Sequence, residues 1–223
     1  MDINQYDKLN QYNQNNYRLQ PLFSSFLAEF QLDIDHVKVR DWIYAQAEDC
    51  TNRVNLTFDE PELQEYYSAT MDAIDKVHYD TGLSQQWKHV FKQGWANADN
   101  HDRFDLAHTH PRASFVSVYY PEVLDGEFGP LELINPVTEA QMVIHSERDY
   151  NCTAAFNQYT AQRWRVEPKT GKLVIFPSWV QHHAMPKLSP GGRLSIALNS
   201  FIVPNDNNPM LELRGQDIYT CLE

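Results

Sequence analysis

"FPSWVQHHAMP", residues 176–186, ends a strand-like run and then sets two histidines side by side. Adjacent residues of an extended chain point to opposite faces, so if one of His182 and His183 faces a pocket, the other faces away from it. Eleven residues after His182, Arg193 begins another strand-like run behind a Pro-Gly-Gly turn. Two strands joined by such a turn form a hairpin, so we expect His182 and Arg193 to lie close together.

The run that begins at Arg193 alternates between a polar and an apolar face. The polar face carries Arg193, Ser195, Ala197 and Asn199, and the apolar face carries Leu194, Ile196 and Leu198. We expect the apolar face to pack under helices and the polar face to look into a barrel. A buried arginine there needs an anionic partner. A guanidinium fork suits a bound dicarboxylate, whereas a purely structural arginine would pair with a local acid such as Asp125 or Glu127.

Two further histidines lie upstream at a spacing that suits a metal. His108 and His110 are two residues apart, so on an extended segment both imidazoles project to one face. Completed by a residue from a distant strand, such a pair suits a first-row transition metal. The other histidines outside residues 176–186 are interpreted as surface or structural residues: His36, His78, His89, His101 and His145.

After residue 85 the sequence is typical of short β-strands. Runs of β-branched and aromatic residues cover 89–98, 113–120, 129–136, 162–168, 171–177 and 193–203, with Pro, Gly, Asp and Asn between them. Such a series predicts a sandwich or barrel. Residues 137–160 have no convincing strand pattern, and we expect a long loop there.

A first helix is expected over residues 36–49. Asp35 precedes it and is a suitable N-cap, because its carboxylate can accept hydrogen bonds from the first N–H groups of a helix. The expected apolar stripe consists of Val37, Trp42 or Ile43, and Ala45.

A second helix has a stronger start signal. Asp59 is followed three residues later by Glu62, with Pro61 in the first turn, and Gly82 closes the segment. Apolar side chains recur at helical spacing in between, at Leu63, Tyr66, Tyr67, Thr70, Ile74 and Val77. We expect both helices to pack on a sheet.

Composition limits the class of protein. The net charge of −12 and pI near 5.1 argue against nucleic acid as a partner, because phosphate binding needs clustered Lys and Arg. Three widely spaced cysteines form no disulfide framework or zinc motif, and no apolar run reaches the length of a membrane span. We therefore expect a soluble, cytoplasmic protein with no membrane partner. The sequence leaves open whether the chain forms a homodimer.

The chain is interpreted as one domain over residues 1–223. Residues 1–17 are rich in Asn and Gln and are expected to form a flexible arm. Residues 18–84 provide mainly helical support, and residues 85–205 form the β-barrel core.

The motifs together resemble those of Fe(II)- and 2-oxoglutarate-dependent oxygenases, in particular an uncharacterised branch of that superfamily. In order they are Trp95-Ala96-Asn97, His108-Thr109-His110-Pro111, Ser117-Val118-Tyr119-Tyr120, Gly129-Pro130-Leu131, Phe176-Pro177-Ser178-Trp179 followed by His182, and Arg193-Leu194-Ser195. The resemblance implies a mainly β fold, a double-stranded β-helix (a jelly roll, similar to cupins) with the N-terminal helices packed on the barrel.

The resemblance also implies a site and a reaction. Fe(II) would be held by His108, His110 and His182. The distal carboxylate of the cosubstrate 2-oxoglutarate would bind Arg193, Ser195 and Tyr120. Asn97 is a weaker candidate for binding the other end of the cosubstrate. The implied activity is hydroxylation of a small-molecule or peptide substrate by O₂, with decarboxylation of 2-oxoglutarate to succinate.

The sequence departs from the superfamily at one ligand. Most members have an acid where this chain has His110, and Asp105 is the nearest upstream acid that could replace it. Two other functions stay open, a cupin-like metalloprotein that does not use 2-oxoglutarate and a non-catalytic jelly-roll binding or structural protein. The cupin motif is incomplete, because Ser114 and Phe115 stand where its glutamate is required.

Overall fold

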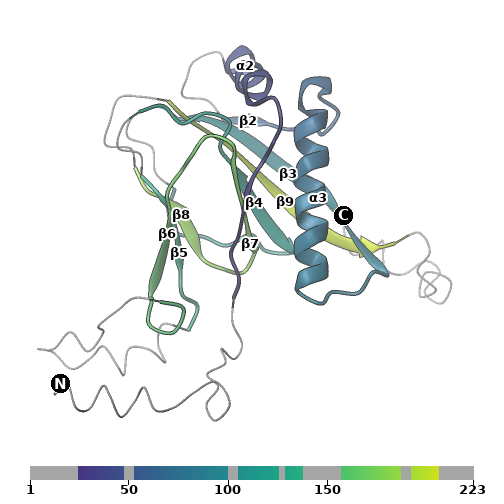
Figure 1. The fold of residues 1–223 in the computed structure, drawn as a ribbon, viewed down its shortest axis with the longest axis vertical. Helices are drawn as coiled ribbons and strands as arrows, with labels where there is room; N and C mark the ends of the chain where they lie inside the picture. Colours follow the sequence, from purple (N-terminus) through teal and green to yellow (C-terminus); the bar gives the residue numbers. More distant parts are fainter. Residues whose placement is uncertain are drawn as a thin grey trace, which may run out of the picture.

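The computed structural model describes residues 25–47, 53–99, 105–125, 129–137, 157–186 and 192–205. Its strands form two antiparallel sheets (Figure 1). The larger sheet has the strand order β1 (Ala28–Gln31), β7 (Lys172–Pro177), β4 (Phe115–Tyr119), β9 (Arg193–Pro204), β3 (Trp87–Asp99) and β2 (Arg53–Asn55). The smaller sheet has the order β6 (Arg163–Val166), β5 (Leu131–Ile134) and β8 (His182–Ala184).

The helices cover one side of the larger sheet. They are α2 (His36–Gln46), the short 3₁₀ helix η1 (Pro61–Leu63) and α3 (Gln64–Asp80). In Figure 1, α3 runs across the larger sheet on the side away from β5, β6 and β8. Leu194, Ile196 and Leu198 of β9 are buried among helix residues such as Ile43 and Tyr66, as the alternation in the sequence predicts. Each fully buried aliphatic side chain contributes roughly 2 kcal/mol to this layer.

A second apolar cluster lies between the two sheets. Its buried members are Val116, Val118, Tyr120, Leu131, Leu133, Val166, Val174, Phe176 and Val180. We call it the inter-sheet core. The predicted fold class is therefore confirmed, with two facing antiparallel sheets and helices packed on the larger one. None of the helices among the described residues is long and apolar enough to cross a membrane.

The predicted helices are present, with corrections to their details. Asp35 caps α2 by accepting a hydrogen bond from the Lys38 N–H group, as expected. The predicted stripe of α2 is wrong except for Ile43, because Val39 and Ile43 form its buried face while Val37 is exposed. The capping box expected at Asp59 does not form, because η1 precedes α3 and no side chain caps either start.

The α3 stripe is confirmed. All six predicted positions are buried, with Ala73 and His78 in addition, and Gly82 closes the helix with a φ of +76°. The predicted arm over residues 1–17 and most of the predicted loop over 137–160 lie outside the described residues.

The six predicted strands are all observed, but the predicted hairpin is wrong. β4 lies between β7 and β9 in the larger sheet, so the strand before His182 does not pair with the strand at Arg193. After β7 the chain crosses to the smaller sheet, where His182 begins β8. The edge strands β1 and β2 and the short β8 were not among the predicted strands.

Candidate metal centre

Three histidines converge at one end of the space between the sheets. His108 and His182 form an isolated antiparallel bridge, in which each backbone N–H donates to the carbonyl of the other at 3.0 Å. The His110 N–H donates to the Ser178 carbonyl at 3.0 Å, which fixes the upstream pair against the β7–β8 turn. One possible ligand atom from each imidazole lies within 4.8 Å of the others. Among the described residues this is the group that could hold a metal ion.

Two of the three imidazoles have their tautomer set by the backbone. The Nδ1–H of His108 donates to the Leu106 carbonyl at 2.7 Å, and the Nδ1–H of His182 donates to the Val180 carbonyl at 2.9 Å. A carbonyl oxygen can only accept, so in each neutral ring the proton is on Nδ1 and Nε2 keeps its lone pair. Both Nε2 atoms are therefore available to a metal.

The rings of His110 and His182 are neutral at physiological pH. Burial, together with electrostatic repulsion from His182, His108 and Arg53, lowers the pKa of His110 to about 4. Burial likewise lowers the pKa of His182 to about 4, against the opposing effects of the Val180 carbonyl and Asp105. A neutral imidazole is the form that binds metals.

Aromatic contacts orient the imidazole planes. Trp95 of β3 stacks on His110 with 5.6 Å between ring centroids, and the Arg53 guanidinium lies 3.8 Å over the Trp95 ring. Phe176 meets His182 edge-on at 4.7 Å. The metal centre is thus held by stacking on the side of the larger sheet and by the inter-sheet core beneath it.

His183 faces away from this centre, as strand alternation predicts. Its Nε2 atom lies 3.1 Å from the Glu132 carboxylate on the other side of the smaller sheet. Glu132 is buried, which by itself would raise its pKa, but hydrogen bonds from Arg163, Arg165 and His183 lower it to about 2. His183 therefore belongs to an ion-pair cluster behind the sheet, while its neighbour His182 faces the metal centre.

Arg193 reaches across the interior from the larger sheet toward the smaller one. The arginine is 3% exposed, and its Nη1 donates a hydrogen bond to the carbonyl of Gly129, which leads into β5. Asp125, one of the two local acids considered as its partner, is exposed, and Glu127 lies outside the described residues.

The other predicted residues of this wall also face inward. Asn97 and Ser195 are opposite each other in the β3–β9 pairing, and the Asn97 amide donates to the Ser195 hydroxyl at 3.4 Å. Tyr120 is a buried member of the inter-sheet core. The sheets thus bring the predicted metal ligands and the predicted carboxylate-binding residues to one interior. Asp105, the predicted alternative to His110, is exposed and is not a member of the histidine group.

Sequence reasoning missed the residues that hold His110. Asn199 lies 3.0 Å from its Nδ1 atom, and Gln93 lies 3.0 Å from the Asn199 amide nitrogen. The alternation of β9 already placed Asn199 on the polar face, but nothing in the sequence indicated which side chain it meets. The stacking of Trp95 on His110 was likewise not predicted.

Part of the chain is similar to a known protein family. Residues 93–199, which contain all three histidines and Arg193, match the model of a family described as "Putative 2OG-Fe(II) oxygenase". No curated protein matches the sequence.

Similar solved structures include HygX from Streptomyces hygroscopicus with nickel and 2-oxoglutarate bound, which is 10% identical with a TM-score of 0.55 over 80% of this chain and 83% of that one. The 2-oxoglutarate complex of the viral collagen prolyl hydroxylase vCPH from Paramecium Bursaria Chlorella virus-1 is 9% identical, with a TM-score of 0.52 over 78% of this chain and 95% of that one. At these identities the likeness shows a common fold.

Proposed function

Because residues 93–199 match the model of a family described as putative 2OG-Fe(II) oxygenases, we propose that the protein is a dioxygenase that hydroxylates a small-molecule or peptide substrate. In this proposal His108, His110 and His182 bind Fe(II). Arg193, Ser195 and Tyr120 bind the distal carboxylate of 2-oxoglutarate, and Asn97 contributes to the same pocket. The observation that carries the proposal is the convergence of three imidazoles, with ligand atoms within 4.8 Å of one another.

The donor set fits a divalent first-row metal. Imidazole nitrogen suits iron, and three protein ligands leave coordination positions for a cosubstrate and O₂. The usual triad of this chemistry has two histidines and a carboxylate. Here the third ligand is neutral, so the bound metal keeps one more unit of positive charge, which favours an anionic cosubstrate beside it.

The separation of the metal centre from Arg193 suits a dicarboxylate. His182 lies opposite Leu133 in the smaller sheet, and Arg193 contacts Gly129, four residues earlier. Four extended residues span at most about 13 Å, which limits the distance along this strand between the two contact points. A ligand with an acid group at each end could therefore touch the metal with one and the guanidinium with the other.

When bound, Fe(II) and 2-oxoglutarate would supply the oxidation chemistry: O₂ would be consumed, with one oxygen atom entering succinate as CO₂ is released and the other entering a substrate C–H bond. The chain itself supplies binding and shielding. Buried Arg193 would bind the carboxylate through charge-assisted hydrogen bonds, which the low local dielectric strengthens. The inter-sheet core, including Val118, Leu131 and Phe176, keeps bulk water from the cosubstrate.

The carboxylate role of Arg193 is tested by the substitution Arg193→Ala. With Mn(II) in place of iron, calorimetry should show 2-oxoglutarate affinity reduced by about 10- to 100-fold, the worth of a charged hydrogen-bonded pair. Iron-dependent release of succinate from 2-oxoglutarate should fall in parallel.

His183→Ala provides the control, because His183 lies on the outer side of the smaller sheet and should leave 2-oxoglutarate affinity unchanged. Unchanged 2-oxoglutarate affinity in folded Arg193→Ala protein would contradict the cosubstrate assignment. It would favour a cupin-like metalloprotein that uses the same histidines without 2-oxoglutarate.

A further inference from the structure

His110 differs from the other two imidazoles in what its Nδ1 atom faces. The Nδ1 atoms of His108 and His182 face backbone carbonyls, whereas that of His110 faces the side-chain amide of Asn199 at 3.0 Å. Asn199 is 2% exposed. The tautomer of His110, unlike those of its partners, therefore depends on one side chain.

The amide of Asn199 can present either of two groups to His110. With its nitrogen toward Nδ1, as in the structure, the amide donates, and the proton of the neutral ring is on Nε2, 3.2 Å from the Nε2 of His182. A metal ligand needs the opposite arrangement, because Nε2 must offer its lone pair. The ring proton then moves to Nδ1 and requires an acceptor.

The amide oxygen of Asn199 can be that acceptor. A half-turn of the amide exchanges its oxygen and nitrogen with little change of shape. In the present orientation, Oδ1 is buried and accepts no hydrogen bond from the described residues. After the half-turn, Oδ1 faces the Nδ1–H of His110, and the amide of Gln93, which lies 3.0 Å from Asn199, can turn to donate to its second lone pair.

We propose that Asn199, supported by Gln93, is the positioning residue that makes His110 a metal ligand, by accepting the Nδ1–H and so directing the Nε2 lone pair to the metal. The inference rests on the metal site of the proposed function. It gives the third ligand the outer partner that the backbone gives to the other two. It also identifies what supports a histidine at a position where most of the superfamily has an acid.

The test is Co(II) binding by the full chain. Visible absorption of the bound Co(II) is monitored while a chelator competes for the metal. Asn199→Leu keeps the approximate shape of the side chain and removes its acceptor, so Co(II) affinity should fall by about 10- to 100-fold. Asn199→Asp always presents an acceptor to the Nδ1–H and makes Nε2 a stronger electron-pair donor to the metal. This variant should therefore bind Co(II) at least as tightly as the native protein. The matched control is Asn135→Leu, another part-buried asparagine, whose amide donates to the Ala161 carbonyl, and it should leave Co(II) affinity unchanged.

Nuclear magnetic resonance of the native protein with Zn(II) gives an independent answer that needs no variant. The ¹⁵N shifts of His110 should show a protonated Nδ1 and a metal-bound Nε2. Metal binding through Nδ1, or native affinity in folded Asn199→Leu protein, would overturn the inference, as would equal losses in Asn199→Leu and Asn199→Asp. If the native protein bound no Co(II), that result would contradict the proposed metal site itself, and it can be told apart from a failure of the role proposed for Asn199.

Discussion

Two buried histidines away from the metal centre link α3 to the larger sheet. His78 donates its Nε2–H to the Ser84 carbonyl at 3.0 Å, so its Nδ1 atom accepts from His89 Nε2 at 3.0 Å. The remaining nitrogen of His89 lies 3.1 Å from the Ser200 hydroxyl. Each ring nitrogen of this pair thus has a hydrogen-bond partner. Their expected structural role is confirmed.

This pair should make the stability of the protein pH-dependent. Burial, with a smaller electrostatic contribution from His78, lowers the pKa of His89 to about 4, whereas an unfolded histidine titrates near 6.5. Between these values the unfolded chain binds a proton that the folded chain does not. Stability should therefore fall as pH decreases from about 6.5 to 4, by about 2 kcal/mol for His89 at pH 5.

Urea unfolding of the metal-free protein at pH 7 and pH 5 measures this effect. His110 and His182 act in the same direction, so the contribution of His89 is isolated by His89→Gln, which cannot gain the proton. The variant should lose less stability than the native protein on going to pH 5. Equal losses in both proteins would show that His89 titrates normally in the fold.

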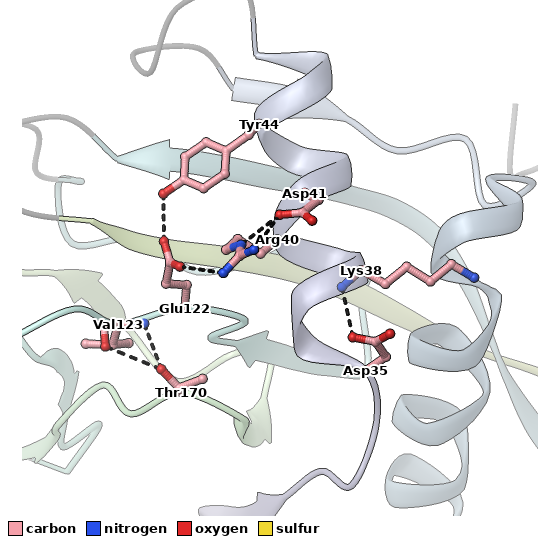
Figure 2. A network of polar contacts seen from close by, with 8 residues as sticks. All are labelled: Asp35, Lys38, Arg40, Asp41, Tyr44, Glu122, Val123 and Thr170. Atoms are coloured by element: carbon pink, nitrogen blue, oxygen red, sulfur yellow. Dashed lines mark hydrogen bonds and ion pairs between the residues drawn. The ribbon is translucent and has the colours of Figure 1, made fainter.

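At the scale of elements, α2 helps to position the strand that carries Arg193. Figure 2 shows Tyr44 and Arg40 of α2 reaching Glu122, with the Tyr44 hydroxyl 2.7 Å and the Arg40 guanidinium 3.4 Å from its carboxylate. The backbone carbonyl of Glu122 accepts from the Leu194 N–H at 2.9 Å. The helix therefore holds the segment against which β9 begins, one residue from the guanidinium proposed to bind the cosubstrate.

Tyr44→Phe should weaken 2-oxoglutarate binding without affecting the metal. Loss of one hydrogen bond to the carboxylate, about 1 kcal/mol, should raise the Kd for 2-oxoglutarate by roughly two- to fivefold. Tyr119→Phe is the control, because it removes another contact of α2, the 2.5 Å hydrogen bond with His36, on the β4 strand. Calorimetry with Mn(II) measures the affinity. A loss of 2-oxoglutarate affinity in both variants, or in neither, would contradict the proposed role of the contact between Tyr44 and Glu122.

Element-scale patterns were predictable where they depend on local periodicity. The two faces of β9 and the stripe of α3 follow from alternation and helical spacing. The buried face of α2 does not, because the helix is short and Val39 and Ile43 compete with equally apolar neighbours such as Val37. Which face is buried depends on how the helix meets the sheet.

At the scale of the whole molecule, sequence predicted the strands better than their order. The turn before Arg193 suggested a hairpin, but the chain passes from one sheet to the other after β7, and β4 comes between β7 and β9. For the same reason the contact between Asn199 and His110, 89 residues apart, could not be foreseen. Both the strand order and this contact depend on the pairing of strands that are far apart in the sequence, which no local sequence pattern indicates.

The central claim is that one metal, held by three imidazoles, and a buried arginine act on the same dicarboxylate. Anaerobic addition of Fe(II) followed by 2-oxoglutarate tests it most directly, through the visible charge-transfer band of a chelated iron–2-oxoglutarate complex. We predict one Fe(II) per chain and a saturable band in the native protein and in His183→Ala, but no band in His182→Ala. A folded native protein that takes up Fe(II) without developing the band, or takes up none, would contradict the account.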